Sequence, residues 1–296
     1  MFYSKIIKRE LDQITSLKEL TEVYGEIASI RMKKTRDYVL KNRDFLASIE
    51  VIFKDALNFY AKKLSDLAMR DKTKLGKKVT LLAHNGRVVS VLISANTGFY
   101  GQVVRETFRK FIKDIEDKDV EVTIIGRLGR TLFLEEKPNR PYTYFELPDY
   151  GIDSQKLSEA IKHLVQYEEI RVYYGKYYSV VTQKPTTFNI SAGKPVEDEI
   201  GGTTVSYIFE PSVEKILMFF ETQIFASLFD QAIRESQLAK FASRILSMDR
   251  ASDNIKNRIK KLTFDNLKIS HNIMNRKQLN TLSSSMYKNE KQFEYV

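Results

Sequence analysis

The segment of this sequence that most resembles a phosphate-binding turn is the glycine-containing run at residues 94–101. Gly98 and Gly101 follow an apolar run and precede an amphipathic stretch, which predicts a strand, a turn and a helix in that order. Backbone amides at such a helix start can hold a phosphate. The spacing matches neither GxGxxG nor GxxxxGKS/T. A structural turn is therefore the prediction, and an α/β enzyme with an anion site here is the alternative.

Aromatic residues form a second candidate cluster in the middle of the chain. Arg171 and Lys176 are interspersed with four tyrosines: Tyr173, Tyr174, Tyr177 and Tyr178. Such a cluster can stack the bases of single-stranded nucleic acid. Two paired strands with aromatic cross-strand neighbours account for the same pattern. We favour the strand pair.

Several classes of chemistry are excluded or disfavoured by composition. The chain has no cysteine, so it has no disulfide, cysteine metal site or thiol nucleophile, in keeping with a reducing cytoplasm. His84, His163 and His271 are far apart and lack ligand spacing. No catalytic triad or carboxylate pair stands out. We therefore expect no active site, metal or cofactor on this chain.

The 296 residues carry a formal net charge of +10. Ten basic and only three acidic residues fall between Lys240 and Lys277. Such a surface suits nucleic acid, anionic lipid or an acidic protein partner. The sequence has no apolar run of about 18 residues, so no transmembrane span is expected, and no secretory leader is expected at the start.

Both ends of the chain predict long helices. All six prolines, and every glycine except Gly25, fall between Gly76 and Pro211. Towards the C-terminus, apolar residues recur in alternating steps of four and three, interrupted by only two polar positions. This apolar seam consists of Phe241, Ile245, Met248, Ser252, Ile255, Ile259, Leu262, Asn266, Ile269 and Ile273. A helix from residue 211 to about 285 would be on the order of 110 Å long, so we expect the two ends to pair as an antiparallel coiled coil.

The middle of the chain alternates between strand and helix patterns. We expect strands at residues 88–93, 120–125, 170–174 and 177–182, and helices at residues 102–115, after Gly126 and at 153–167. This alternation predicts a small, mostly parallel α/β sheet, Rossmann-like in layout. The expected domains are a coiled-coil helix at 1–72, an α/β domain at 73–208, a second coiled-coil helix at 209–285 and a flexible tail at 286–296.

Five short motifs, in the right order along nearly the whole chain, resemble the gamma subunit of F-type rotary ATPases. Residues 20–34 resemble its first helix, of the form ITxAMxxVAxxKMRK, and residues 91–101 stand where the family has a strand followed by SDRGLCG. Residues 124–130 resemble its second strand and glycine-rich turn, and residues 207–212 its YEPS motif. The most specific match is the MxxATDNAxxxxxxLT pattern, which is met by Met248, Ala251, Ser252, Asp253, Asn254, Leu262 and Thr263.

The resemblance implies a non-catalytic central rotor shaft. Its terminal helices would form a coiled coil inside a hexameric ring of alpha and beta subunits, which bind and hydrolyse ATP. Further partners would be an epsilon-like subunit or other rotor or motility proteins, with no nucleic acid and only indirect membrane contact, at the cytoplasmic face of the cell membrane. The implied partner-contact residues are Arg31, Met32, Lys33, Lys34, Asp253, Asn254, Ser270, His271, Arg276 and Lys277; Gly98 and Gly101 form a structural turn.

The chain departs from the family where the shaft would meet a beta-subunit loop. An expected arginine is Ser270, and an expected carboxylate is Lys277. These departures, with a tryptophan-free composition, favour a specialised paralogue, for example a motility-linked motor of small wall-less bacteria. The alternatives are a housekeeping ATP synthase gamma subunit and a basic coiled-coil protein that binds nucleic acid.

Overall fold

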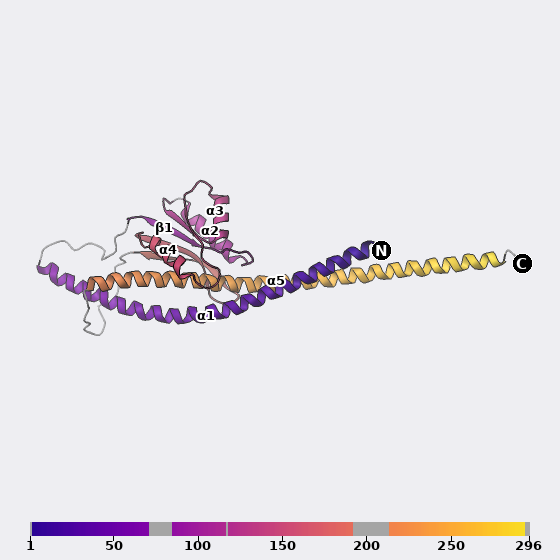
Figure 1. The fold of residues 1–296 in the computed structure, drawn as a ribbon, viewed down its shortest axis with the longest axis horizontal. Helices are drawn as coiled ribbons and strands as arrows, with labels where there is room; N and C mark the ends of the chain where they lie inside the picture. The colour runs from indigo at the N-terminus through magenta and orange to yellow at the C-terminus, as the bar shows by residue number, and fades with distance from the viewer. Residues whose placement is uncertain (1, 71–84, 117, 192–212, 294–296) are drawn as a thin grey trace. The chain divides into compact units, whose positions relative to one another are not determined.

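A computed structural model describes residues 2–70, 85–116, 118–191 and 213–293 (Figure 1). The chain divides into two compact units. The helical unit comprises Met1–Ile27 and Ser247–Val296, and the sheet unit comprises Ala28–Leu246. Among the described residues, no helix is long and apolar enough to cross a membrane.

The two ends of the chain form long helices, as the distribution of proline and glycine predicted. Helix α1 spans Phe2–Arg70 and helix α5 spans Val213–Phe293, so each contributes to both units. Helix α5 continues into the segment expected as a tail, as far as Phe293, and the flexibility of that tail stays a prediction. The serines at 283–285 lower helix propensity only slightly, and no glycine or proline follows to end the helix.

The sheet unit contains a five-stranded sheet in the order β3-β2-β1-β4-β5. Its strands are β1 (Val88–Ile93), β2 (Glu121–Ile125), β3 (Thr143–Phe145), β4 (Glu169–Tyr177) and β5 (Gln183–Ser191). The first four run parallel, and β5 is antiparallel to β4. Helices α2 (Val103–Ile115), α3 (Arg127–Glu136) and α4 (Ser154–Leu164) connect the parallel strands. This confirms the mostly parallel α/β sheet.

Helices cover both faces of this sheet. On one face, Phe111 of α2 and Phe133 of α3 pack with Leu92 and Ile124. On the other, Leu164 of α4 and Phe229 of α5 pack with inward side chains of the strands. Every one of these side chains is less than 2% exposed. The C-terminal helix is therefore part of the core of the sheet unit.

The prediction of two separate strands at 170–174 and 177–182 is wrong. Strand β4 runs without a break through Gly175, and residues 178–182 form the hairpin turn in which the amides of Tyr178 and Ser179 donate to the Thr182 carbonyl. No glycine, proline or asparagine marks that turn, and Pro185 is tolerated because β5 lies at the sheet edge. Tyr173 and Tyr174 pair with Thr187 and Thr186, so their cross-strand neighbours are not aromatic.

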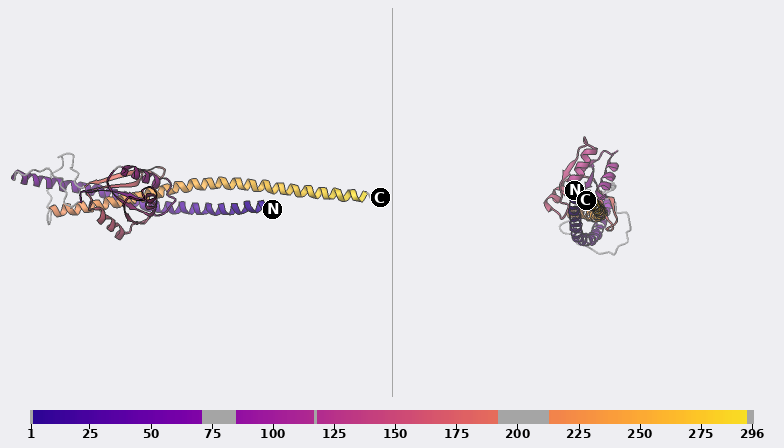
Figure 2. Two further views of the ribbon diagram at one scale, coloured as in Figure 1. Left: turned by 90° about the horizontal axis from the view of Figure 1, so that it is seen from above. Right: turned by 90° about the vertical axis from the view of Figure 1, so that its right-hand side faces the viewer.

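Within the sheet unit, α1 packs along α5 (Figure 2). Met32 and Val39 of α1 share a buried cluster with Leu238, Ala239 and other residues of α5. The Asn42 side chain donates to Gln231 at 2.8 Å. Because the residue numbers rise along one helix as they fall along the other, the two helices are antiparallel here.

Within the helical unit, the same direction holds. Arg258 forms an ion pair with Glu10 at 2.7 Å, and a Cβ added at Gly25 would lie 3.6 Å from Cβ of Met248. All ten positions of the apolar seam are buried or partly buried, although two of them belong to the sheet unit. Lys260, Lys261 and Lys268, between seam positions, are exposed. The seam is therefore the inward face of α5.

The turn after β2 requires glycine for two reasons. Gly126 has a φ of +102°, which side-chain-bearing residues rarely adopt. A Cβ at this position would also lie 2.9 Å from the backbone nitrogen and oxygen of Ala95. The two turns that end β1 and β2 thus touch each other through their backbones, and this contact places residues 94–101 beside the start of α3.

Candidate functional site

The turn at residues 94–101 holds an anion, and that anion belongs to the chain itself. The Asp149 carboxylate accepts hydrogen bonds from the amides of Asn96 and Thr97, at 3.0 Å each to Oδ2, and from the Thr97 hydroxyl at 3.0 Å. Asn96 also donates to the Leu147 carbonyl at 2.6 Å, which holds the Asp149 loop against the turn. The amides that a phosphate would need are therefore already engaged, which favours the structural turn.

Lys240 of α5 completes this arrangement. Its ammonium donates to Asp149 Oδ1 at 3.1 Å and to the Ser94 carbonyl at 2.9 Å. Burial lowers the pKa of Lys240, and the Asp149 carboxylate opposes that shift. Burial alone would raise the pKa of Asp149, but the Lys240 charge and the Asn96 amide outweigh it, so the net shift is downward. The pair is a buried charge-assisted link between the sheet and α5.

Two further polar residues of α5 extend the link. Arg244 donates to the Gly98 carbonyl at 2.8 Å, and its guanidinium lies 3.8 Å from the ring centre of Tyr100. Gln237, which is 1% exposed, donates to the carbonyls of Pro148 and Gly151. We call these contacts the anchor site; its residues are Asp149, Gln237, Lys240, Arg244 and the turn at residues 94–101. It fixes two loops of the sheet to successive turns of one helix.

Aromatic rings fill the space beside the anchor site. Phe241 is fully buried and meets Tyr100 and Tyr150 edge to face, with ring centres 6.3 and 6.1 Å apart. The Arg31 guanidinium of α1 lies 5.0 Å from the Tyr150 ring centre. Cation–π and edge-to-face contacts of this kind add to the area that the rings bury. Both long helices are thus tied to the Asp149 loop.

The two glycines of the structural turn have different roles. Gly101 has a φ of +62°, so it uses the conformation that favours glycine. Gly98 is not at a positive φ, and its contribution is the carbonyl that accepts from Arg244. Phe99 between them is at a φ of 65° and is 69% exposed. Such a conformation costs about 1 kcal/mol or more in a residue other than glycine.

A second polar cluster crosses from α1 to β4 through α5. Asn42 donates to Gln231, Gln231 donates to Glu235 at 3.0 Å, and the Tyr174 hydroxyl donates to the other oxygen of Glu235 at 3.5 Å. Glu235 is 4% exposed. At the positions immediately before Gln231 and Glu235 on α5, Asp230 pairs with Arg234 at 2.8 Å, and the Arg234 guanidinium lies 3.4 Å from the ring centre of Tyr38. Both helices and the sheet are therefore cross-linked at more than one level.

The partner-contact residues predicted near the N-terminus differ in exposure. Lys33 and Lys34 are exposed, and Arg31 is half-buried against Tyr150. Met32 is only 8% exposed, because it packs with α5 and with Tyr100 in the core of the sheet unit. Met32 therefore contributes to packing within this chain.

The C-terminal candidates are all exposed. They are Asp253, Asn254, Ser270, His271, Arg276 and Lys277, and all lie in the helical unit. Asp253 also forms a surface ion pair with Lys256 at 3.4 Å. The structure does not gather these six side chains into one site; they are distributed along α5.

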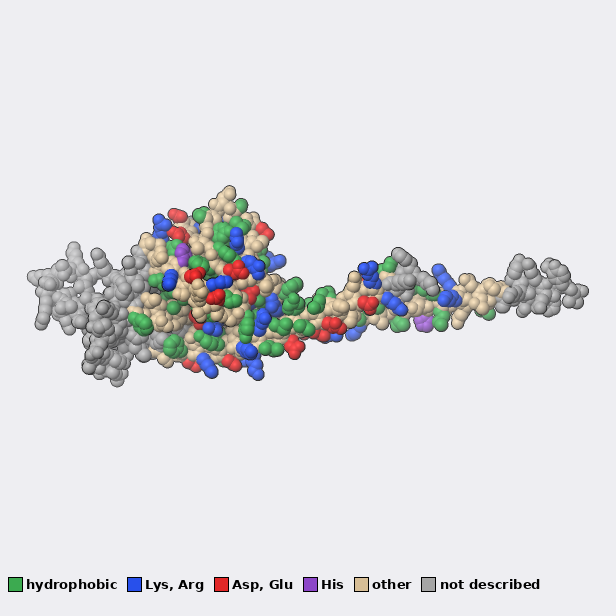
Figure 3. Space-filling model, viewed as in Figure 1, with side chains coloured by type: hydrophobic (Ala, Val, Ile, Leu, Met, Phe, Trp, Pro, Cys, Tyr) green, Lys and Arg blue, Asp and Glu red, His purple; other side chains and the backbone are tan. Residues whose placement is uncertain are grey.

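Large apolar side chains are exposed beside these residues. Phe264, Leu267 and Met274 follow one another at helical spacing and are 67%, 57% and 61% exposed, and Leu279 and Leu282 are also exposed. Phe264 and Leu267 each lie two positions along the chain from Leu262 and Ile269 of the seam, which points them to another face of the helix. Figure 3 shows hydrophobic and basic side chains interspersed along this part of α5. A row of this size on a solvated surface indicates a partner.

Sequence reasoning missed the anchor site. Lys240 and Arg244 were counted with the solvated basic residues, but both are buried, each only 5% exposed. The signal that could have found them is a pair of cations one turn apart among apolar and small residues, since such cations need partners. Asp149 could not be assigned to the turn, because it is far from residues 94–101 in sequence.

The family model described as ATP synthase matches residues 4–268, and the curated relatives are ATP synthase gamma chains. The chain belongs to this gamma-subunit family. It is 23% identical over 267 residues to the gamma chain of Pelotomaculum thermopropionicum, which covers 87% of this chain and 89% of the relative. To the gamma chain of Elusimicrobium minutum it is 26% identical, covering 84% and 87%.

Solved structures show the same gamma-subunit fold. A chain in the central stalk and c-ring structure of Tetrahymena thermophila mitochondrial ATP synthase has a TM-score of 0.57 at 14% identity, covering 79% of this chain and 99% of that one. A chain of the Euglena gracilis mitochondrial enzyme in rotational state 3 has a TM-score of 0.52 at 15% identity, covering 86% and 93%. The chain is thus a divergent gamma subunit, a non-catalytic component of the central stalk; in this family the catalytic sites lie on beta subunits.

In this gamma subunit, acid is expected to weaken the anchor site. Because the pKa of Asp149 is lower in the folded chain than in the unfolded one, its ionised form stabilises the fold fully above the unfolded pKa. That stability is lost as the pH falls through the folded pKa, which lies below 3.8. The free energy of unfolding of the sheet unit should therefore decline from about pH 5 downward. Chemical denaturation followed by tyrosine circular dichroism measures this decline.

The Asp149→Asn variant should show a shallower decline over the same pH range, whereas Glu159→Gln, which alters an exposed carboxylate, should follow the unsubstituted chain. An identical acid slope in Asp149→Asn would contradict the assignment.

Proposed function

We propose that this chain is the rotor shaft of an F-type rotary ATPase. Its terminal helices wind as an antiparallel coiled coil within a ring of alpha and beta subunits, and the sheet unit couples the shaft to other rotor parts. The observation that carries this proposal is the exposed row of Phe264, Leu267 and Met274 beside cations on a helix whose apolar seam is already buried. A second apolar row needs a second partner.

The mechanism follows from asymmetry. Three equivalent beta subunits meet different faces of one shaft, so each is biased towards a different conformation, and turning the shaft exchanges the three states. The basic side chains of α5, including Arg276 and Lys277, suit an electronegative inner wall. The anchor site and the Asn42–Gln231–Glu235 cluster resist slippage between the sheet and the shaft, which torque transfer requires.

An epsilon-like subunit and a peripheral location at the cytoplasmic membrane face belong to the same proposal. They rest on family membership, because the shaft of a synthase must connect the ring to a membrane rotor. The similar chain in the central stalk and c-ring structure of the Tetrahymena thermophila enzyme supports this placement.

A specialised motor is the second candidate. It is favoured by Ser270 and Lys277, which replace the polar residues expected at the contact with a beta-subunit loop. The relatives named above are synthase chains and do not point to motility. Affinity purification of the native complex followed by mass spectrometry separates the two candidates: membrane rotor subunits support a synthase, and other co-purifying subunits support a specialised motor.

The shaft itself is tested by ATP turnover in the assembled complex. The double variant Arg276→Glu/Lys277→Glu should lower turnover several-fold, because it reverses two charges that face the ring wall. Both side chains are exposed, so the isolated chain should keep its thermal stability. Lys156→Glu, an exposed change on α4, is the matched control and should leave turnover unaltered. Unchanged turnover in the double variant, or recovery of the chain without ring subunits, would refute the proposal.

A further inference from the structure

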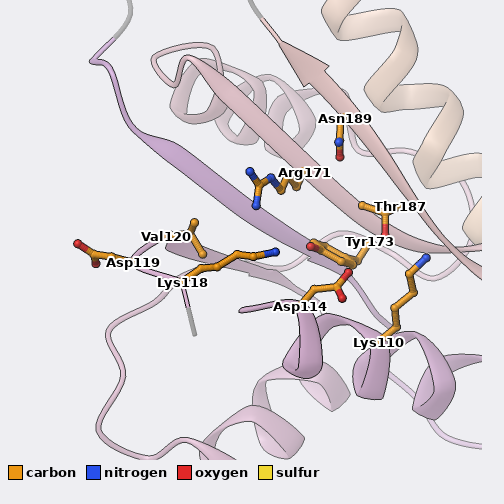
Figure 4. A pocket seen from close by; sticks show the side chains of 9 residues that line it. All are labelled: Lys110, Asp114, Lys118, Asp119, Val120, Arg171, Tyr173, Thr187 and Asn189. Carbon is orange, nitrogen blue, oxygen red and sulfur yellow. The ribbon is translucent and has the colours of Figure 1, made fainter. Parts of the chain in front are cut away.

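An open groove lies on the sheet unit where α2 ends and leaves β4 and β5 uncovered (Figure 4). It has a volume of about 580 Å³. Its lining residues come from α2, the loop after it and two strands: Lys110, Asp114, Lys118, Asp119, Val120, Arg171, Tyr173, Thr187 and Asn189. The groove is on the face of the sheet that α2 and α3 cover, so it is separate from the anchor site.

Two cationic side chains converge in this groove. Figure 4 shows Lys118, from the loop, and Arg171, from β4, pointing towards each other, while Asp119 points away. Arg171 is held by Glu169 through Nε at 2.7 Å, which leaves its two terminal nitrogens directed at the groove without an ion pair to any other described residue. Among the described residues, the ammonium groups of Lys110 and Lys118 also lack an ion pair. Like charges that converge in this way favour an anion between them.

One polar side chain that lines the groove has an unused hydrogen-bonding group. The hydroxyl of Thr187 is buried and has no hydrogen-bond partner among the described residues. Buried hydroxyls are rarely left unsatisfied, since each costs about 1–3 kcal/mol. Thr187 lines the groove, and Figure 4 shows it beside Tyr173.

We propose that this groove binds an oxyanion, a phosphate or carboxylate group, between Lys118 and Arg171. Lys110, Thr187 and Asn189 line the rest of the groove. Asp114 opposes the binding of a fully ionised ligand and favours one that also carries a donor, such as a hydroxyl or amide. Inorganic phosphate, the phosphates of ADP, and the side chain of a glutamate-containing peptide share this chemistry, and the test distinguishes among them.

The test is a titration of the full-length ¹⁵N-labelled chain, followed by amide chemical shifts. Its three arms are inorganic phosphate, ADP and acetyl-glutamate amide, each at up to about 10 mM, where a site with a Kd near 1 mM is nearly filled. We expect saturable shifts at residues 110–120, 171–173 and 187–189 in at least one arm, and the arm with the lowest Kd identifies the source of the oxyanion.

Variants separate the site from general attraction to a basic protein. Lys118→Gln and Arg171→Gln should each weaken binding about tenfold, which is the loss of one charge-assisted hydrogen bond. Asp114→Asn should strengthen it, and Lys156→Gln, an exposed change on α4, should do nothing. Because Lys118 is exposed, its variant should fold even if Arg171→Gln does not. No saturable shift in any arm, or equal affinity in Lys118→Gln, overturns the proposal.

Discussion

Asp149→Asn is expected to lower the free energy of unfolding of the sheet unit by about 3–5 kcal/mol, because it leaves the Lys240 ammonium buried beside a neutral amide. The side chains of the pair are only 6% and 11% exposed, so water cannot replace the lost partner. The Asn96 and Thr97 amides also lose a charged acceptor. Denaturation in urea, followed by tyrosine circular dichroism, gives the value.

A double-mutant cycle is the control for this prediction. Lys240→Met keeps the length of the side chain but removes the charge, and it should cost less than Asp149→Asn, because Asp149 keeps its donors from Asn96 and Thr97. In the Lys240→Met background, Asp149→Asn should cost much less than it does alone, since no buried cation is left unpaired. Strictly additive losses would mean that the two side chains are not coupled.

Phe241→Ala is the second large effect, with an expected loss of about 3–5 kcal/mol. The side chain is fully buried, and its removal leaves a cavity between Tyr100 and Tyr150. Phe241→Leu, which keeps most of the volume, should cost much less. Thermal unfolding of the full chain measures both.

The matched control is Phe264→Ala on the same helix. Phe264 is 67% exposed, so its truncation should barely change the stability of the isolated chain. If both alanine variants lost the same stability, the assignment of Phe241 to the core and of Phe264 to an outer face would be wrong.

The long helices and most of the parallel strands could be predicted because their signals are local. Strand β1 has the predicted bounds of 88–93, and the helix predicted near 153 begins where Asp153 caps α4 by accepting from the amides of Gln155 and Lys156. The heptad spacing also identified the inward face of α5, since Ser252 and Leu262 on it are 7% and 5% exposed. Periodicity alone carries this information.

Strand β5, the hairpin before it and the anchor site could not be predicted in the same way. Residues 178–182 contain no glycine, proline, asparagine or aspartate, and a single serine, Ser179, whose hydroxyl accepts from the Thr182 amide, is too weak a signal to predict the hairpin. Lys240 resembles its exposed neighbours in sequence, and only the tertiary position of Asp149 explains its burial. Net charge along a helix does not distinguish a cation that faces solvent from one that faces a carboxylate.

The Asp149 carboxylate, which is bound by the turn at residues 94–101, restricts how this chain can diverge. Asp149 and Lys240 lie 91 residues apart in the sequence, yet loss of Asp149 alone leaves the Lys240 ammonium unpaired in a dry interior. Lineages should therefore gain or lose the two charges together. Among related sequences, the residues at positions 149 and 240 should therefore covary, and neither position needs to be invariant.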